Sequence, residues 1–117
     1  QATNLRKYIL ENDKILKIDS FPERDSKKKR VFESVKMSVC VSLIQNTKVD
    51  NDYIFPVYVW DDKYKSSGLS TCFSLNDIMA IDSVDYTIPR LRPEYKTTII
   101  KLLKNIMMLF QQKWLME

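Results

Sequence analysis

The chain has 117 residues, a net charge of +4 and 44% hydrophobic residues, a composition that supplies a hydrophobic core and excludes a wholly disordered chain. It contains no histidine and one glycine, so histidine-based catalysis or metal binding and a glycine-rich phosphate loop are both excluded. Two cysteines without histidine cannot build a structural zinc site, and no apolar run approaches the roughly 20 residues that cross a bilayer.

The cysteines indicate the cellular compartment of the chain, and the first residue indicates whether it is a segment of a longer protein. Cys40 and Cys72 both lie in strand-like contexts, so we expect reduced side chains that pack inside a cytoplasmic protein rather than a disulfide. The chain begins with Gln1, which favours a segment excised from a longer protein, although removal of a leader or tag would leave the same start.

Charge is distributed unevenly along the chain. Residues 1–48 carry a net charge of +5, residues 49–89 a net charge of −5, and residues 90–117 a net charge of +4. A basic first segment fits a polyanionic partner. A net charge of this size is also ordinary for a soluble domain, so charge alone leaves both interpretations open.

The first quarter of the chain predicts a helix followed by a strand. Asn4 is suited to cap the helix. Three apolar residues of this helix share one face at helical spacing: Leu5, Tyr8 and Ile9. A strand is predicted over residues 14–20, with Leu16 and Ile18 on one side. A helix of this length that leads into a strand is typical of α/β proteins.

Two further strands are predicted after a charged loop at residues 22–30. The strand over residues 37–44 alternates between a bulky face (Met37, Val39, Val41, Leu43) and a small face (Ser38, Cys40, Ser42). We expect this strand to be covered on both sides, with something packed closely over its small face. The strand over residues 53–60 contains Pro56, which cannot donate a ladder hydrogen bond and therefore predicts an edge position.

The remaining elements are shorter, apart from the last. Residues 61–69 are predicted as a loop and residues 70–75 as a short strand, followed by a brief helix over 77–81 that Asn76 or Ser74 would cap.

The C-terminal part is predicted to be extended over residues 84–91 and helical over 93–115, with Pro93 at the first helical position. Its apolar residues form a stripe: Ile99, Leu102, Leu103, Ile106, Phe110 and Trp114. This stripe fits either a core or a surface that faces a partner.

One basic run and one aromatic residue are candidates for nucleic-acid contact. The run consists of Lys27, Lys28, Lys29 and Arg30, which fit phosphate contacts or, more commonly, a solvated loop. Phe32 lies between this run and the next strand, where its ring would either stack on a base or anchor the loop in the core. The acidic pairs Asp50/Asp52 and Asp61/Asp62 match no calcium-loop or nuclease spacing, and we expect them to be solvated.

The order of motifs in residues 3–90 resembles the C-terminal part of the catalytic domain of adenine-N6 DNA methyltransferases from type II restriction–modification systems, including the fused restriction enzymes. The resemblance is carried by Leu-Arg-Lys-Tyr-Ile-Leu-Glu-Asn, by Lys-Ile-Leu-Lys-Ile-Asp-Ser-Phe, by the Val-Phe junction and by Met-Ser-Val-Cys-Val-Ser-Leu-Ile. The later Ser-Leu-Asn-Asp-Ile-Met-Ala-Ile-Asp-Ser and Tyr-Thr-Ile-Pro are similar to the segment that follows this core.

The resemblance implies a fold and a set of roles. It implies the last strands of a partial Rossmann-like methyltransferase sheet, with 14–20 and 37–44 antiparallel, and a C-terminal helix. It implies that Phe32 packs on the flipped-out target adenine, and that Lys36 lies near the same pocket and the DNA backbone. The implied partners are double-stranded DNA and the rest of a parent chain, and the implied cofactor of that parent is S-adenosylmethionine.

Two departures from the family limit what this chain does alone. It lacks the catalytic Asn-Pro-Pro-Tyr and the glycine-containing loop for S-adenosylmethionine, so we expect no cofactor in this segment and no methyl transfer by it. The implied organisation is a methyltransferase-like portion at 1–60, a connecting segment at 61–92 and a C-terminal helix at 93–117 that begins a following domain. The alternatives are a stand-alone cytoplasmic α/β interaction module and a small basic nucleic-acid-binding protein.

Overall fold

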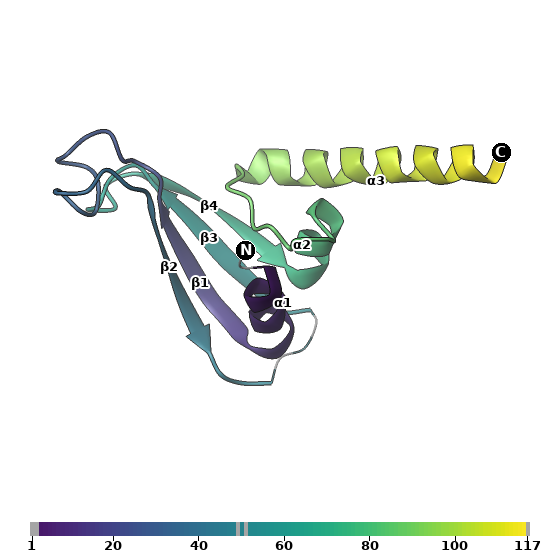
Figure 1. Cartoon of the computed structure of the whole chain (residues 1–117), viewed down its shortest axis with the longest axis horizontal. Helices are drawn as coiled ribbons and strands as arrows, with labels where there is room; N and C mark the ends of the chain where they lie inside the picture. The colour runs from purple at the N-terminus through teal and green to yellow at the C-terminus, as the bar shows by residue number, and fades with distance from the viewer. Residues whose placement is uncertain (1–2, 49, 51, 117) are drawn as a thin grey trace.

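The computed structural model describes residues 3–48, 50 and 52–116, with the side chains of the last helix described as far as residue 112. Its elements, in chain order, are α1 (Thr3–Asn12), β1 (Lys14–Phe21), β2 (Val39–Gln45), β3 (Ile54–Trp60), β4 (Gly68–Ser74), α2 (Leu75–Ile81) and α3 (Pro93–Met116). The fold is therefore α/β, with one four-stranded sheet and a long C-terminal helix (Figure 1).

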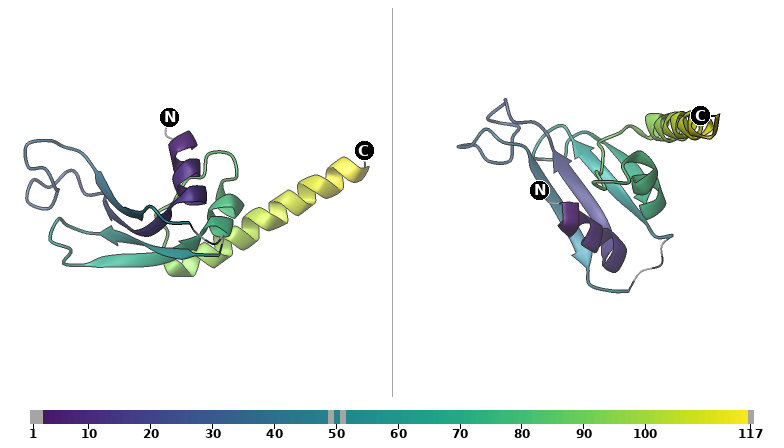
Figure 2. Two further views of the ribbon diagram at one scale, coloured as in Figure 1. Left: turned by 90° about the horizontal axis from the view of Figure 1, so that it is seen from below. Right: turned by 45° about the vertical axis from the view of Figure 1, so that its right-hand side comes forward.

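The sheet is mixed and has the strand order β2-β1-β3-β4. β1 pairs antiparallel with β2, as predicted, and parallel with β3, while β3 pairs antiparallel with β4. The chain therefore crosses over the end of β1 between β2 and β3. α1 lies on one face of the sheet, whereas α3 projects beyond it (Figure 2).

α1 and β1 differ from the predicted faces for identifiable reasons. Of the three residues on the predicted face of α1, Ile9 packs against the core, but Leu5 and Tyr8 are each 61% exposed and the helix buries Leu10 instead. In β1 the pairing with β2 shifts register at Leu16, an irregularity of the β-bulge type. The extra residue changes the strand's alternation, so Ile15 and Ile18 both face the core while Leu16 is exposed. The helix also begins at Thr3, which places the predicted cap Asn4 inside the first turn.

The expectation that the strand at 37–44 is covered on both sides is wrong. β2 begins at Val39, and every residue of it after Val39 is exposed, so neither face of this edge strand is covered along its length. Val41 and Leu43 are about half exposed, at 52% and 50%. The cysteines differ from expectation in the same way, since Cys40 on β2 and Cys72 on β4 are both free but exposed rather than packed inside.

The expectation that Pro56 places its strand at an edge is also wrong, because β3 lies between β1 and β4. The parallel pairing of β3 with β1 covers only Val57–Val59. Pro56 precedes that stretch, so its missing N–H falls where this ladder has not begun. The interior position explains why Phe55 and Val57 are almost completely buried.

The structure contains the short strand and the capped helix that were predicted after residue 69. β4 begins two residues earlier than predicted, at Gly68. Ser74 caps α2 in a capping box, in which its hydroxyl accepts from the Asp77 N–H and the Asp77 carboxylate accepts from the Ser74 N–H. The alternative cap, Asn76, lies inside the helix and is exposed.

α3 begins at Pro93, as predicted, with Glu94 in its first turn. Only the start of its apolar stripe packs on the body, since Ile99 and Leu103 are half-buried whereas Leu102, Ile106 and Phe110 are 44–64% exposed. Trp114 belongs to the same predicted stripe, but its side chain lies outside the described part. Within the described residues, no helix is both long and apolar enough to cross a membrane.

One hydrophobic core joins both halves of the chain on the α1 side of the sheet. Its buried members are Leu10, Ile15, Ile18, Phe55, Val57, Phe73, Leu75, Ile78 and Tyr86. The residues of α2 and Tyr86 therefore pack against the same sheet face as α1. This core holds the sheet rigid, and the loops at its far end are positioned by that sheet.

Candidate nucleic-acid interface

Two loops meet at one end of the sheet: the loop of residues 22–38, which joins β1 to β2, and the loop of residues 61–67, which joins β3 to β4 (Figure 1). The backbone N–H of Lys63 donates to the carbonyl oxygen of Lys29 at 2.7 Å. The Lys63 Nζ also pairs with the Glu33 carboxylate at 2.9 Å. The second loop therefore supports the longer one along its side.

Arg30 organises the longer loop from within. Its guanidinium donates to the backbone carbonyls of Arg24 at 3.2 Å and Phe32 at 3.0 Å, and also to that of Glu33. A backbone turn adds to this, since the Arg30 N–H donates to the Ser26 carbonyl at 2.9 Å. A rigid fork of donors satisfies several carbonyls that a turn would leave unpaired. Phosphate contact by Arg30 stays a prediction, and its guanidinium is already bonded to the loop.

The three lysines before Arg30 have a different environment. Lys27, Lys28 and Lys29 are exposed, and their side chains form no ion pair with any described residue. Lys36 lies on the same loop and pairs with the Asp25 carboxylate at 3.2 Å, both side chains being well exposed. An exposed pair of this kind contributes little stability, so Lys36 can exchange Asp25 for another anion at small cost.

Phe32 is 51% exposed and lies outside the hydrophobic core. The alternative in which this ring anchors the loop in the core therefore does not hold. Val35 and Met37 on the same loop are also exposed, at 49% and 45%. The loop thus combines an accessible aromatic ring with unpaired lysines, which are the two components of surfaces that bind single bases and phosphates.

Two acidic residues of these loops, Glu33 and Asp62, have structural partners that lower their pKa values. The hydrogen bond from Lys63 lowers the pKa of Glu33, and the same pair raises the pKa of Lys63. Backbone N–H groups of Ser66 and Tyr64 donate to the Asp62 carboxylate and lower its pKa. Asp62 therefore holds the turn of the 61–67 loop and is not free for acid–base chemistry.

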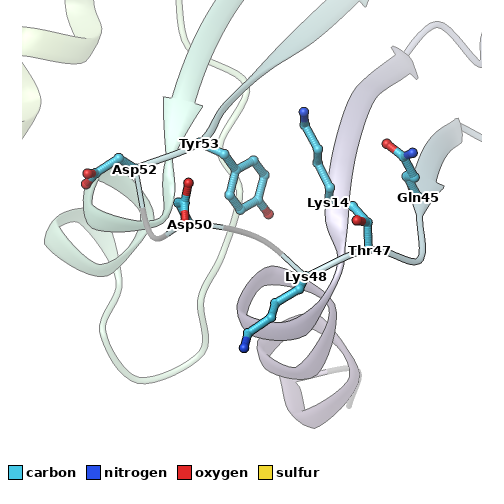
Figure 3. Close-up of a pocket in the computed structure, with 7 residues that line it drawn as sticks. All are labelled: Lys14, Gln45, Thr47, Lys48, Asp50, Asp52 and Tyr53. Carbon is cyan, nitrogen blue, oxygen red and sulfur yellow. The ribbon is translucent and has the colours of Figure 1, made fainter.

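The acidic pair at Asp50 and Asp52 lies at the opposite end of the sheet. These residues line an open polar hollow of about 510 Å³ together with Lys14, Lys48 and Tyr53 (Figure 3). The figure shows the two carboxylates pointing in different directions rather than converging on one point. Among the described residues, no group of three or more acidic or cysteine side chains is placed to hold a metal ion.

Sequence reasoning did not find an ion cluster on the sheet face opposite α1. Asp19 is 4% exposed and accepts from the Trp60 indole Nε1 at 2.8 Å, with Lys17 at 3.1 Å and Lys65 at 3.7 Å. The Trp60 ring stacks on Tyr58, with a centroid distance of 5.5 Å. A carboxylate in the middle of an apolar strand was the available signal, because such a group is rarely buried without partners.

Comparison of this chain with protein-family models, with curated proteins and with solved structures finds no match.

Proposed function

We propose that this chain is a segment of a site-specific adenine-N6 DNA methyltransferase of the type II restriction–modification kind, and that it supplies contacts to the target base and the DNA backbone. In this proposal β1, β2 and α1 are the last part of a Rossmann-like methyltransferase sheet. S-adenosylmethionine and the catalytic amide belong to the rest of the parent chain, because this segment has neither the glycine loop nor Asn-Pro-Pro-Tyr.

The observation that carries the proposal is the pairing of Phe32 with three free lysines on one loop. Phe32 is half exposed, and Lys27, Lys28 and Lys29 are exposed in the same loop. Arg30 fixes the backbone of this loop through the carbonyls on either side of it. A preformed loop is favourable for binding because less chain entropy is lost when DNA docks.

The proposed roles follow from the chemistry of the target. The N6 atom of adenine is unreachable inside a duplex, so the base must leave the stack, which costs stacking energy. A flat apolar ring such as Phe32 offsets part of that cost. The lysines would neutralise phosphates and release condensed counterions, which favours binding without selecting a sequence.

The experiment measures binding of this chain to two duplexes of the same sequence. In one duplex a central adenine is paired, and in the other it lies opposite an abasic site and is easily extruded. We expect the second duplex to bind more tightly. Phe32→Ala should remove this preference, with a loss of roughly tenfold because a stacked aromatic contributes about 1–3 kcal/mol per base.

A matched control and a stability measurement decide whether Phe32 stacks on a base or stabilises the fold. Tyr8→Ala removes an aromatic ring that is 61% exposed on α1 and should leave both affinities unchanged. The free energy of unfolding of Phe32→Ala should stay within about 0.5 kcal/mol of the parent value, as is usual for exposed positions. A parallel loss of stability and affinity, or equal binding of the two duplexes, would sink the proposal.

A further inference from the structure

An open hollow of about 480 Å³ lies on the α1 side of the sheet, and Ser38, the last residue of the 22–38 loop, is among its lining residues. Its floor is apolar and formed by Ile18 and Val57, with Ile88 at the side. α1 contributes Arg6 to its rim, and the segment before α3 contributes Arg90. The volume falls within the range of about 300–1,000 Å³ that is usual for small-molecule sites.

The hollow exists because the side chains of β2 on this face are small. Cys40 and Ser42 line it from β2, and they pair with Ser20 and Ile18 of β1. The alternation of small side chains along β2 predicted close packing by another element. In the described part of the chain no helix fills this place, and the space is open.

One polar side chain lines the hollow from the central strand β1. Ser20 is 8% exposed and lines the hollow. A hydroxyl on the wall of an open hollow can donate a hydrogen bond to a polar ligand atom or accept one from it.

Two arginines are the charged residues that line the hollow. Arg6 is anchored, because its Nε and Nη2 donate to the Asp85 carbonyl at 3.2 and 3.1 Å, which leaves Nη1 available. Arg90 is exposed and pairs with no acidic side chain among the described residues. None of the residues that line the hollow is acidic. Two arginines beside an apolar floor are suited to an anion with an apolar body.

We propose that this hollow binds a small phosphomonoester whose body is flat and apolar. Such a group carries close to two negative charges at neutral pH and so matches two guanidinium groups better than a carboxylate does. Its body would cover Ile18 and Val57, and a phosphate or ester oxygen would meet the Ser20 hydroxyl. This inference is independent of the proposed function, because the hollow shares none of the residues of the 22–38 loop that contact DNA in that proposal.

The alkylation rates of the two cysteines measure ligand binding to the hollow in the full chain. Cys40 lines the hollow, whereas Cys72 is exposed on the other face of the sheet, so each reports on one side. We expect phenyl phosphate to slow alkylation of Cys40 by N-ethylmaleimide at least fivefold and to leave Cys72 unchanged. Inorganic phosphate should protect Cys40 less at the same concentration, because it cannot cover the apolar floor.

Variants test the charge and the space separately by calorimetry with phenyl phosphate. Arg90→Gln should weaken binding roughly tenfold, as expected for loss of a charge-assisted hydrogen bond. Arg92→Gln is the matched control, since this arginine lies two residues further on and does not line the hollow. Ser42→Leu, at an exposed edge position, should fill the hollow and abolish binding without unfolding the chain.

The outcomes that would overturn the proposal are specific. They are the absence of both heat and Cys40 protection with phenyl phosphate at millimolar concentration, or equal weakening by Arg90→Gln and Arg92→Gln. Protection of Cys40 by duplex DNA but not by phenyl phosphate would also overturn it, and would assign the hollow to the DNA surface instead.

Discussion

The indole Nε1 of Trp60 donates a hydrogen bond of 2.8 Å to the carboxylate of Asp19, across the parallel pair of strands β3 and β1. Burial by itself would raise the pKa of Asp19, but the hydrogen bonds from Trp60 and Lys17 outweigh it and hold the pKa below its usual value of 3.8. The carboxylate is therefore ionised at neutral pH. It connects the two central strands on the face that no helix covers in the described structure.

Removal of this carboxylate should destabilise the sheet. Asp19→Ala leaves the Trp60 N–H and Lys17 without their acceptor, and we expect the free energy of unfolding to fall by about 1–3 kcal/mol, the range for hydrogen bonds to charged groups. Urea denaturation followed by tryptophan fluorescence and circular dichroism measures this. Asp61→Ala, at an exposed acidic position, is the control and should change stability by less than about 0.5 kcal/mol. Equal effects of the two variants would contradict this role.

Stability should also fall in acid, and the direction follows from the pKa shifts. The pKa values of Asp19 and Asp77 are lower in the folded chain than their usual 3.8, despite burial, because of hydrogen bonds from Trp60 and Lys17 and from Lys96 and Ser74. Below about pH 4 the unfolded chain therefore binds protons more readily than the folded chain.

The stabilisation from these carboxylates is complete above about pH 5, roughly one unit above their unfolded pKa, and is lost as the pH falls through their folded pKa values. Urea midpoints measured from pH 7 down to pH 2.5 should decline below about pH 5. The decline should be shallower for Asp19→Asn, whose side chain does not titrate. A stability that stays constant, or rises, over this range would show that the carboxylates are not held in their charged form.

Gly68 is required by a close approach rather than by its backbone angles. A Cβ atom at this position would lie 2.6 Å from Cε3 of Trp60 and 2.7 Å from the carbonyl oxygen of Val59. Trp60 cannot give way easily, since its indole is bonded to Asp19 and stacked on Tyr58. Gly68→Ala should therefore cost about 1–3 kcal/mol, as overpacking usually does. Ser70→Ala, further along the same edge strand, should be nearly neutral in the same denaturation assay.

The basic loop should give DNA binding its salt dependence. Each phosphate contact adds about 0.9 to the slope of log affinity against log salt concentration. We therefore expect the double variant Lys27→Gln/Lys28→Gln to flatten this slope by roughly 2, without changing any preference between sequences. The double variant Lys101→Gln/Lys104→Gln on α3 removes the same charge elsewhere and should leave the slope nearly unchanged.

Arg30→Gln should behave differently from the lysine variants. Because this guanidinium bonds the loop carbonyls, its loss should increase proteolytic cleavage within residues 22–38 more than it changes the salt slope. Equal flattening by both lysine pairs would mean that the chain attracts DNA through its net charge alone. A flattened slope with an intact loop in Arg30→Gln would instead make Arg30 a phosphate contact.

The amino-acid sequence by itself determined the elements that depend on local chemistry. The helix from Pro93, a capped start of α2 at Ser74 or Asn76 and the strand character of residues 14–20 all follow from neighbours within a few positions, and the structure selects Ser74 as the cap. The same is true of the candidate loop, since a charged run between two strands lies at the surface. Antiparallel pairing of β1 and β2 was implied by resemblance and is present in the structure.

Only the tertiary structure decided which strands lie at the edges and which faces are buried. Pro56 lies in a central strand, because β3 pairs with β1 only beyond it, and β2 with its alternating pattern lies at the edge. Because of the irregularity at Leu16, Ile15 is buried together with Ile18, whereas Leu16 is exposed. Strand order is set by contacts between residues far apart in sequence, and a single extra residue reverses the alternation of a strand. The exposure of Phe32 and the bonding of Arg30 to its own loop depend on that same assembly, and a linear pattern does not contain them.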